Sequence, residues 1–246
     1  TLLLADESNL KLELQLHYHS YPNSGGAFKV QIFSPYIFLN LSQLPVTIKT
    51  RPWAGHAKMV AGQESHDDDY DASEQRKPFL VSRIGESNNR FLIRSRDSSW
   101  SKPLSFDVIG SEVGVVIPSS SGDRELHLGL DIQDGLSKFK LSKVVKLAPR
   151  YLIHNKLSHA VLIAESMGGD PVRIGADERV PLHWFHVASN KHATLALEGS
   201  NLEWTAPFSI DNIGNVYLRM VRDDEPQHLI QVDVQIQGPT IFVRLL

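Results

Sequence analysis

Two stretches of the chain, W-S-K-P-L-S-F-D-V-I-G at residues 100–110 and W-T-A-P-F-S-I-D-N-I-G at residues 204–214, follow nearly the same pattern. Trp, Ser or Thr, Pro, Ser, Asp, Ile and Gly recur in the same order at a constant separation of 104 residues (204 − 100). A match of this kind indicates an internal duplication, and a duplication determines the architecture before any single element does. We therefore expect two copies of one structural unit.

The beginning of the unit is repeated as well. Y-I-F-L-N at residues 36–40 and Y-L-I-H-N at residues 151–155 are separated by 115 residues (151 − 36). The V-T-I and V-L-I runs that follow them keep this separation, and a Pro stands shortly before each Tyr, at Pro35 and Pro149. The duplication therefore includes this pair of strand-like runs.

The two copies align less closely between these anchors. We place K-P-F-L at residues 77–80 opposite V-P-L-H at residues 180–183, and F-L-I at residues 91–93 opposite L-A-L at residues 195–197. The separation falls from 115 to 104, so the first copy holds about eleven additional residues, which the acidic run at residues 62–76 supplies. Its few apolar residues do not offset the entropy of ordering it, and its carboxylates lack the spacing of a calcium loop. We predict a solvated, mobile insertion that folding does not require.

Runs of strand length recur about every ten residues with Gly, Pro, Asn or Asp between them, and no window follows a helical period. Residues 10–19 alternate Leu or Tyr with polar residues, which predicts a half-buried strand with one face against a core. The predicted fold class is all-β, with tandem antiparallel β-sandwich repeats. Residues 1–26 would lead in from a preceding repeat or complete the first one, residues 27–137 would form the first repeat, and residues 138–246 the second.

The repeated Trp motif has a structural interpretation. Its apolar positions alternate with polar ones, so we expect the Trp and the two apolar residues after the Pro to point inward. The Ser and Asp would then tie the following turn through local bonds to the backbone. Asn40 and Asn155 each end a strand before a turn, where an amide side chain can satisfy backbone groups, and we predict that both are structural caps.

Composition excludes several classes of partner. The chain has 246 residues with a formal net charge of −3, which gives no basic field for nucleic acid or for an anionic membrane surface. It contains no Cys, which rules out a disulfide scaffold and a thiolate site, and no apolar run is long enough to span a bilayer. The chain begins at Thr1 without a signal-like leader, so we expect it to be a piece of a longer protein.

Catalytic and metal-binding motifs are missing from the sequence. It has no nucleophile elbow, H-E-x-x-H, P-loop or dinucleotide fingerprint. His17 and His19 share one strand face but have no third ligand at a suitable spacing, and His183 and His186, three residues apart, would face opposite sides of a strand. We predict no enzyme activity, no metal and no cofactor.

The runs at residues 99–110, 141–156 and 180–184 resemble the adaptor-binding (VAB, or SHR-binding) domain of the vacuolar protein sorting-associated protein 13 family. The resemblance covers nearly the whole chain outside the acidic run. It implies consecutive members of an array of six related β-sandwich repeats, each with a characteristic Asn, here Asn40 and Asn155. It also implies part of a bridge-like lipid transporter, cytoplasmic and peripheral at membrane contact sites, which reaches membranes only through its adaptors.

The partners implied by this resemblance are organelle adaptors that carry a short Pro-x-Pro motif, together with neighbouring repeats of the same chain. A segment with two prolines can add only to a sheet edge, and the second copy has no acidic run beside its candidate edge. The side chains that could receive proline rings there are Tyr151, Ile153, His183, Trp184 and Phe185. The alternatives are a purely architectural spacer, or a β-sandwich that binds lipid headgroups or carbohydrate.

Overall fold

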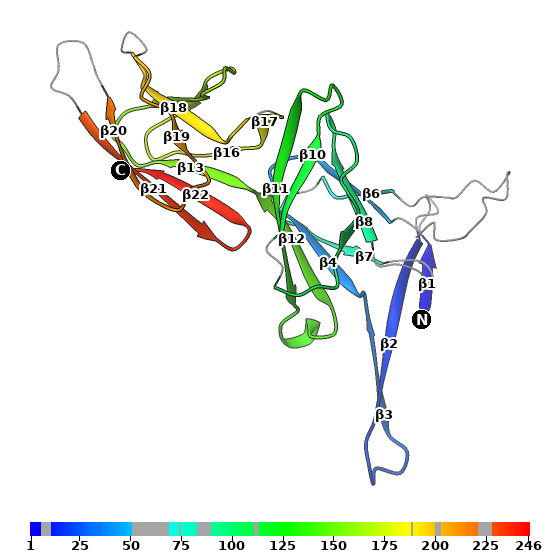
Figure 1. The fold of residues 1–246 in the computed structure, drawn as a ribbon. Helices are drawn as coiled ribbons and strands as arrows, with labels where there is room; N and C mark the ends of the chain where they lie inside the picture. The colour runs from blue at the N-terminus through cyan, green and yellow to red at the C-terminus, as the bar shows by residue number, and fades with distance from the viewer. Residues whose placement is uncertain are drawn as a thin grey trace. The chain divides into compact units, whose positions relative to one another are not determined.

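The computed structural model describes residues 1–5, 11–50, 69–73, 75–82, 90–110, 113–187, 189–199, 203–220 and 228–246. Nearly all regular structure in these ranges is β-strand, which confirms the predicted all-β class (Figure 1). The exception among the described residues is one short 3-10 helix, η1 (Ser137–Phe139). In the same part of the chain, no helix is long and apolar enough to cross a membrane.

Within the ranges that the structure describes, eleven strands precede η1 and eleven follow it. The strands before it are β1 (Leu2–Ala5), β2 (Lys11–Ser20), β3 (Phe28–Phe33), β4 (Tyr36–Asn40), β5 (Val46–Thr50), β6 (Asp69–Asp71), β7 (Pro78–Val81), β8 (Arg90–Ser95), β9 (Leu104–Ser105), β10 (Val113–Pro118) and β11 (Arg124–Asp134). The strands after it are β12 (Lys143–Pro149), β13 (Tyr151–Asn155), β14 (Val161–Glu165), β15 (Val172–Ile174), β16 (Arg179–Leu182), β17 (Trp184–His186), β18 (His192–Leu197), β19 (Phe208–Ser209), β20 (Gly214–Met220), β21 (His228–Gln237) and β22 (Thr240–Leu245).

The chain forms two compact units, which do not follow the predicted boundary at residue 138. The first unit comprises residues 1–112 and 130–147, and the second comprises residues 113–129 and 148–246. Strand β12 belongs to the first unit because it pairs with β4, and the first part of β11 belongs to the second because it pairs with β17. The boundaries of the sequence repeats themselves stay a prediction.

Besides the sheet of β1, β2 and β3, the first unit contains two groups of strands that enclose its core. Strands β12, β4 and β7 are neighbours in one sheet, and β6, β5, β8 and β9 form another. Its core is aromatic: Phe38, Phe91 and Phe106 are fully buried, and the rings of Phe91 and Phe106 stack with centroids 4.0 Å apart. The large rings exclude water from the space between the sheets.

The second unit repeats this plan as a sandwich of a five-stranded sheet, β16-β13-β22-β21-β20, and a four-stranded sheet, β15-β14-β18-β19. Its core is mainly aliphatic and combines Ile153, Val232 and Val243 of the first sheet with Ile163 and Leu195 of the second. Most of the described pairs are antiparallel, as predicted, but the pairs of β12 with β4 and of β22 with β13 are parallel. In each case a strand that follows much later in the sequence thus completes the sheet that the Tyr-to-Asn strand begins.

The Trp motif adopts only part of the predicted arrangement. Phe106 and its counterpart Ile210 are buried, as expected, but Trp204 is 38% exposed and Trp100 is half-buried. The prediction that the Trp points inward is therefore wrong. Arg94 lies over the Trp100 ring, 4.4 Å from its centroid.

The residues next to the two Trp side chains are buried instead. Ser101 exchanges two hydrogen bonds with the backbone of Ile93, and Thr205 does the same with the backbone of Leu195. These bonds turn the Ser or Thr side chain inward, and they leave the Trp outside because neighbouring extended residues face opposite ways.

The predicted acidic insertion contains a strand. Residues 62–68 and 74 lie outside the described residues, but β6 pairs with β5, and Tyr70 within it is 1% exposed. The Tyr70 ring packs against Phe79 with centroids 5.7 Å apart, and its hydroxyl donates to the Ser82 carbonyl at 3.3 Å. The prediction of a solvated loop is therefore wrong for the end of the run, where Tyr70 and Ala72 alternate with Asp71.

The strand predicted over residues 10–19 is confirmed as β2, but its apolar face is not against a core along its whole length. Leu12 and Leu14 are half-buried, whereas Leu16 is 49% exposed and Tyr18 is 61% exposed. Strands β1, β2 and β3 form a separate three-stranded antiparallel sheet. In the residues described, no second sheet covers the outer part of this face.

Candidate functional site

Each copy ties its Tyr-to-Asn strand to its Trp motif through a side-chain hydrogen bond. The Tyr151 hydroxyl donates to Asp211 at 2.6 Å, and the Tyr36 hydroxyl donates to the matching Asp107. Burial, together with the Asp211 carboxylate, raises the pKa of Tyr151. The sequence predicted a local role for the Asp, but in the structure the Ser makes the local bond and the Asp makes the long-range one: Ser209 accepts from the Asp211 amide at 3.2 Å.

Asn155 is 0% exposed and bonds to the backbone on three sides. Its amide nitrogen donates to the carbonyls of His159 at 2.8 Å and Gly175 at 2.9 Å, and its amide oxygen accepts from the Leu157 backbone at 3.0 Å. These bonds close the turn after β13 and join it to the loop that follows β15. A fully buried amide with such partners has the geometry of a cap.

Asn40 repeats this geometry in the first unit. It is 1% exposed, donates to the carbonyls of Leu44 at 2.9 Å and Ala72 at 2.8 Å, and accepts from the Ser42 backbone at 3.0 Å. Ala72 follows directly on β6. The acidic run at residues 62–76, which was expected to be solvated, therefore supplies one of the carbonyls that accept a hydrogen bond from Asn40.

The five residues predicted to contact a peptide fall into two groups. Tyr151 and Ile153 are buried in the core of the second unit, at 3% and 0% exposed, so they present no side chain at a surface. Phe185 is also buried and packs against the Tyr151 ring with centroids 5.0 Å apart. His183 and Trp184 are half-buried, and with Phe185 they line one hollow.

This hollow, which we call the β17 hollow, lies entirely within the second unit and has a volume of about 280 Å³. Strands β14, β15, β16, β17 and β18 contribute to it, together with the first part of β11. The residues that line it are Arg124, Ile163, Ala164, Glu165, Gly169, Asp170, Val172, Pro181, Leu182, His183, Trp184, Phe185, His192, Ala193 and Ile210. Its lining is mostly apolar, with charged groups of both signs, which is the usual character of a binding pocket.

A polar contact holds β17 beside the hollow. Glu165, at the end of β14, accepts from the backbone amide of His186 at 3.2 Å and also bonds to the His186 imidazole. The Glu165 side chain is 14% exposed and the His186 side chain 36% exposed. The Lys191 ammonium lies over the Phe185 ring, 4.8 Å from its centroid. These contacts fix β17 and therefore the position of Trp184.

Two residues that line the hollow stand at sequence positions where the first unit has aromatic rings. Ala193 pairs with Phe208 as Phe91 pairs with Leu104, so Ala193 stands where the first copy has Phe91. Ile210 stands where the first copy has Phe106, by the separation of 104 in the Trp motif. Both Ala193 and Ile210 line the hollow, and both are smaller than the stacked Phe rings at the matching positions of the first unit.

The sequence interpretation missed Ala193 and Ile210 as site residues. The sequence does contain a signal for them, since each replaces a Phe of the first copy by a smaller residue. Recognising the Ala193 replacement required the correct strand register. The described residues hold no cluster of three or more His, Cys, Asp or Glu that could bind a metal. His17 and His19 are exposed on β2.

The family model described as "Vacuolar-sorting associated protein 13, adaptor binding domain" matches residues 1–246. The chain is 38% identical over 247 residues to the intermembrane lipid transfer protein VPS13 of Chaetomium thermophilum, covering 99% of this chain and 8% of that protein. It is 27% identical over 146 residues to vps13E of Dictyostelium discoideum, covering 56% and 3%, and 31% identical over 106 residues to VPS13C of Mus musculus, covering 43% and 2%. The chain therefore spans less than a tenth of the length of these relatives.

The match over the whole chain confirms the resemblance that the sequence motifs indicated. The matched domain is an interaction module, and these comparisons indicate no family of enzymes. The chain belongs to the family of adaptor-binding domains of vacuolar-sorting associated protein 13.

Proposed function

We propose that this chain binds short Pro-x-Pro motifs of organelle adaptors and thereby directs a bridge-like lipid transfer protein to membrane contact sites. In this proposal the peptide binds in the β17 hollow of the second unit. The observation that carries the proposal is the replacement of Phe91 and Phe106 by Ala193 and Ile210, which leaves an apolar space beside Trp184.

The strands around the hollow suit an extended peptide. Strands β15 and β16 each stand at the end of the strand order of their sheet, and both line the hollow, through Val172 and Pro181 respectively. An end strand offers unpaired backbone groups, with which a peptide can pair through the residues between and beyond its prolines. The two prolines themselves donate no N–H and need only apolar contact.

The side chains around the hollow also suit proline. Trp184 gives a flat aromatic surface and Leu182 an aliphatic wall, while Arg124 and Glu165 supply charges for the flanking residues of a peptide. Proline is already restricted in φ, so its binding costs less conformational entropy than that of a flexible residue. Phe185 serves as the floor in this arrangement, and we assign Tyr151 and Ile153 to the core that supports it.

The proposal is tested by titrating the 246-residue chain with a Pro-x-Pro peptide and with the same peptide carrying Ala at both prolines. We expect a Kd on the order of 10 μM for the first and no saturable binding for the second. Replacing Ala193 with Phe fills the hollow with the residue that the first copy has there, so this substitution weakens binding at least tenfold. Trp184→Ala also weakens peptide binding, because it removes the aromatic surface.

The control is Ala206→Phe, the same chemical change at an exposed position outside the hollow. It leaves the affinity unchanged, and circular dichroism of all three variants checks that they remain folded. If the Ala193→Phe variant binds the peptide as tightly as the parent chain, the hollow is not the site. If the parent chain binds no Pro-x-Pro peptide, the proposed function itself fails and the spacer alternative gains support.

A further inference from the structure

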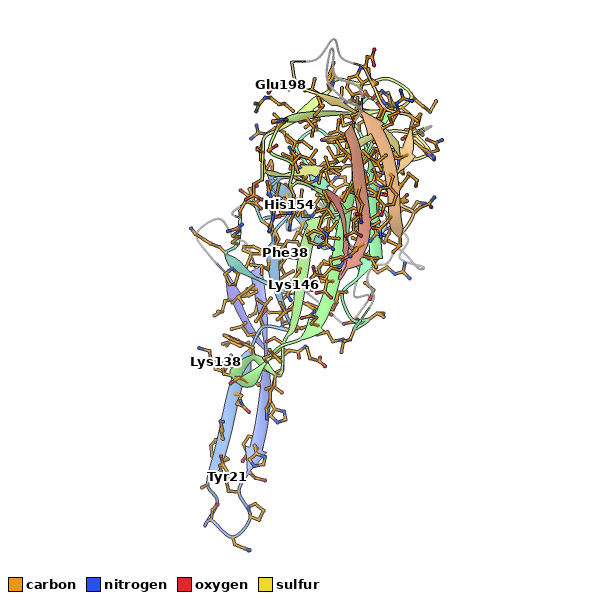
Figure 2. The ribbon with its side chains drawn as sticks, turned by 90° about the vertical axis from the view of Figure 1, so that its left-hand side faces the viewer. Tyr21, Phe38, Lys138, Lys146, His154 and Glu198 are labelled. Carbon is orange, nitrogen blue, oxygen red and sulfur yellow. The ribbon has the colours of Figure 1, made fainter. Side chains whose placement is uncertain are left out.

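The outer face of the five-stranded sheet of the second unit carries a row of charged side chains. The strand registers place Arg179 of β16 opposite His154 of β13 (labelled in Figure 2), and His154 opposite Arg244 of β22. Arg244 in turn lies opposite Asp233 of β21. Ile153, the neighbour of His154 on β13, belongs to the core, so the row lies on the side of the sheet that faces away from the core.

A pocket of about 330 Å³ opens over this row. Besides His154, Arg179 and Arg244, it is lined by Lys156, Phe242 and two Gln side chains. Among the described residues, no Asp or Glu lines it. A concave surface lined by charges of one sign concentrates the electric field, so this pocket attracts anions although the chain as a whole has a formal net charge of −3.

Arg244 uses only part of its hydrogen-bonding capacity within the protein. One terminal nitrogen of its guanidinium donates to Asp233 at 3.0 Å, whereas its Nε is buried and has no hydrogen-bond partner in the described residues. The Arg244 side chain is 31% exposed, so the guanidinium is accessible from the pocket. Arginine binds oxyanions through parallel N–H groups, and an oxyanion in the pocket would supply acceptors that the protein does not.

Two further cations of the pocket have no carboxylate partner. Lys156 and Arg179 are exposed, and neither forms an ion pair with any residue that the structure describes. His154 differs from them, because its Nε2 lies 3.0 Å from the carboxylate of Asp177. Lys156 and Arg179 thus provide two positive charges that are available to a ligand.

The first unit has the paired part of this row. Lys146 of β12 stands at the place of Arg244, because it lies opposite Leu39 in its parallel pair as Arg244 lies opposite His154. Its ammonium lies 3.8 Å from Asp131, which corresponds to the contact of Arg244 with a carboxylate on the neighbouring strand. The ion pair on the outer face of the sheet is therefore common to both units.

The unpaired cations are particular to the second unit. The first unit has Leu39, Leu41 and Pro78 where the second has His154, Lys156 and Arg179, respectively. Three apolar positions in one unit are thus basic in the other, on a sheet of the same plan. Folding of this sheet requires the shared ion pair and not the three additional basic groups, which indicates that those groups serve a ligand.

We propose that this pocket binds a phosphate monoester, either as a free small molecule or as the headgroup of a lipid. A phosphate monoester carries a charge of about −1.5 to −2 at pH 7, which matches the two unpaired charges of Lys156 and Arg179. Arg244 donates to its oxygens, and Phe242 gives apolar contact to its carbon skeleton. The inference does not rest on the peptide site.

The position of the pocket favours a small ligand over a phosphorylated peptide. Its floor is formed by β13 and β22, and each of these strands has a paired neighbour on both sides. Their backbone groups are therefore already used in the sheet, so they offer a peptide no edge with which to pair.

Titration of the 246-residue chain with glycerol 3-phosphate, followed through amide chemical shifts in nuclear magnetic resonance, tests the pocket. We expect saturable shifts in β13, β16, β21 and β22, with a Kd on the order of 1 mM. Dimethyl phosphate, a diester with a single charge, gives no saturable shift. Shifts confined to other strands, or equal affinity for the diester, overturn the proposal.

Substitutions of exposed cations test which side chains hold the ligand. Lys156→Gln and Arg179→Gln each remove one unpaired charge, and each weakens binding about tenfold. The control is Arg219→Gln, the same loss of charge at an exposed position on β20 of the same sheet, outside the pocket. It leaves the affinity unchanged, and equal urea midpoints check that all variants are folded. Unchanged binding by Arg179→Gln, or an equal loss in Arg219→Gln, shows that the pocket is not the site.

Sedimentation with phosphatidylcholine vesicles distinguishes the two sources of the ligand. Vesicles that also contain phosphatidate, a monoester lipid, retain the chain if the ligand is a headgroup, and Arg179→Gln abolishes this retention. Binding of glycerol 3-phosphate without sedimentation assigns a soluble ester instead. Equal sedimentation with phosphatidylglycerol, a diester lipid, contradicts a monoester site. Tighter binding of a phosphoserine peptide than of glycerol 3-phosphate also overturns the proposal, since the ligand would then be a protein.

Discussion

The two units share their polar contacts and differ in what fills the space between their sheets. The bonds of Tyr36 to Asp107 and of Tyr151 to Asp211 are repeated, and so are the buried amides of Asn40 and Asn155. The first unit packs three Phe rings in its core, whereas the second has aliphatic residues at the same places and a hollow beside them. These hydrogen bonds, which position the backbone, are thus retained in both copies, because a buried hydrogen bond forms only in a narrow range of geometries. Core residues have changed, because many combinations of similar volume satisfy a sandwich.

The largest expected effect comes from breaking the ring stack of the first unit. Phe106→Ala removes a ring that is 0% exposed and 4.0 Å from Phe91, and we expect a loss of about 3–5 kcal/mol. Ile210→Ala at the matching position costs about 2 kcal/mol, since Ile210 already borders a hollow and has fewer contacts to lose. Hydrogen exchange of β8 and β18 under urea reports the two units separately. A larger loss for Ile210→Ala would contradict this difference between the cores.

The second expected effect concerns the buried amides, where the two units are alike. Asn155→Ala leaves the carbonyls of His159 and Gly175 without their donor, and we expect a loss of about 1–3 kcal/mol. Asn40→Ala has an effect of the same size. Urea denaturation measures both, and peptide titration below the unfolding transition shows unchanged affinity. An unchanged melting temperature combined with lost binding would mean that Asn155 contacts the ligand and is not a cap.

The smallest expected effect is a pH dependence of the second unit. The pKa of Tyr151 is raised in the folded protein by burial, so the unfolded chain, with a Tyr pKa of about 10, releases this proton first as the pH rises. The contribution of Tyr151 is therefore complete below about pH 10 and declines above it, by at most about 1.4 kcal/mol per pH unit.

Tyr151→Phe removes this contribution to the slope. It costs about 1 kcal/mol below pH 10, because Asp211 is exposed and water replaces the hydroxyl. Urea midpoints of both proteins on each side of about pH 10 measure the difference. If the two proteins lose stability in parallel above that pH, the Tyr151 proton is not more tightly held in the folded state.

The candidate site could be predicted only in part, because the sequence did not establish which strand residues of the two copies correspond. The alignment placed Ile93 opposite Leu197, but the strand pairings place it opposite Leu195: Ile48 pairs with Ile93 as Ile163 pairs with Leu195. A shift of two residues keeps every side chain on its face, so the apolar pattern is equally satisfied either way. The same shift occurs in β7 and β16, where Val81 and not Phe79 corresponds to Leu182. Trp184 and Phe185 were therefore found from their residue types, whereas Ala193 was missed.

The duplication, the all-β class, the family and the repeated Tyr, Asn and Trp positions could be predicted from the chain alone, because they follow from residue identity and alternation. Which strands share a sheet became clear from the folded structure. Alternation predicts that Val145 and Val30 each lie on the apolar face of a strand, but it does not predict which sheet covers that face. In the structure Val145 is buried, whereas Val30 is exposed. The structure also shows that Asp107 bonds to Tyr36, 71 residues away, and not to its own turn. Such choices depend on contacts between distant segments, which a local pattern does not encode.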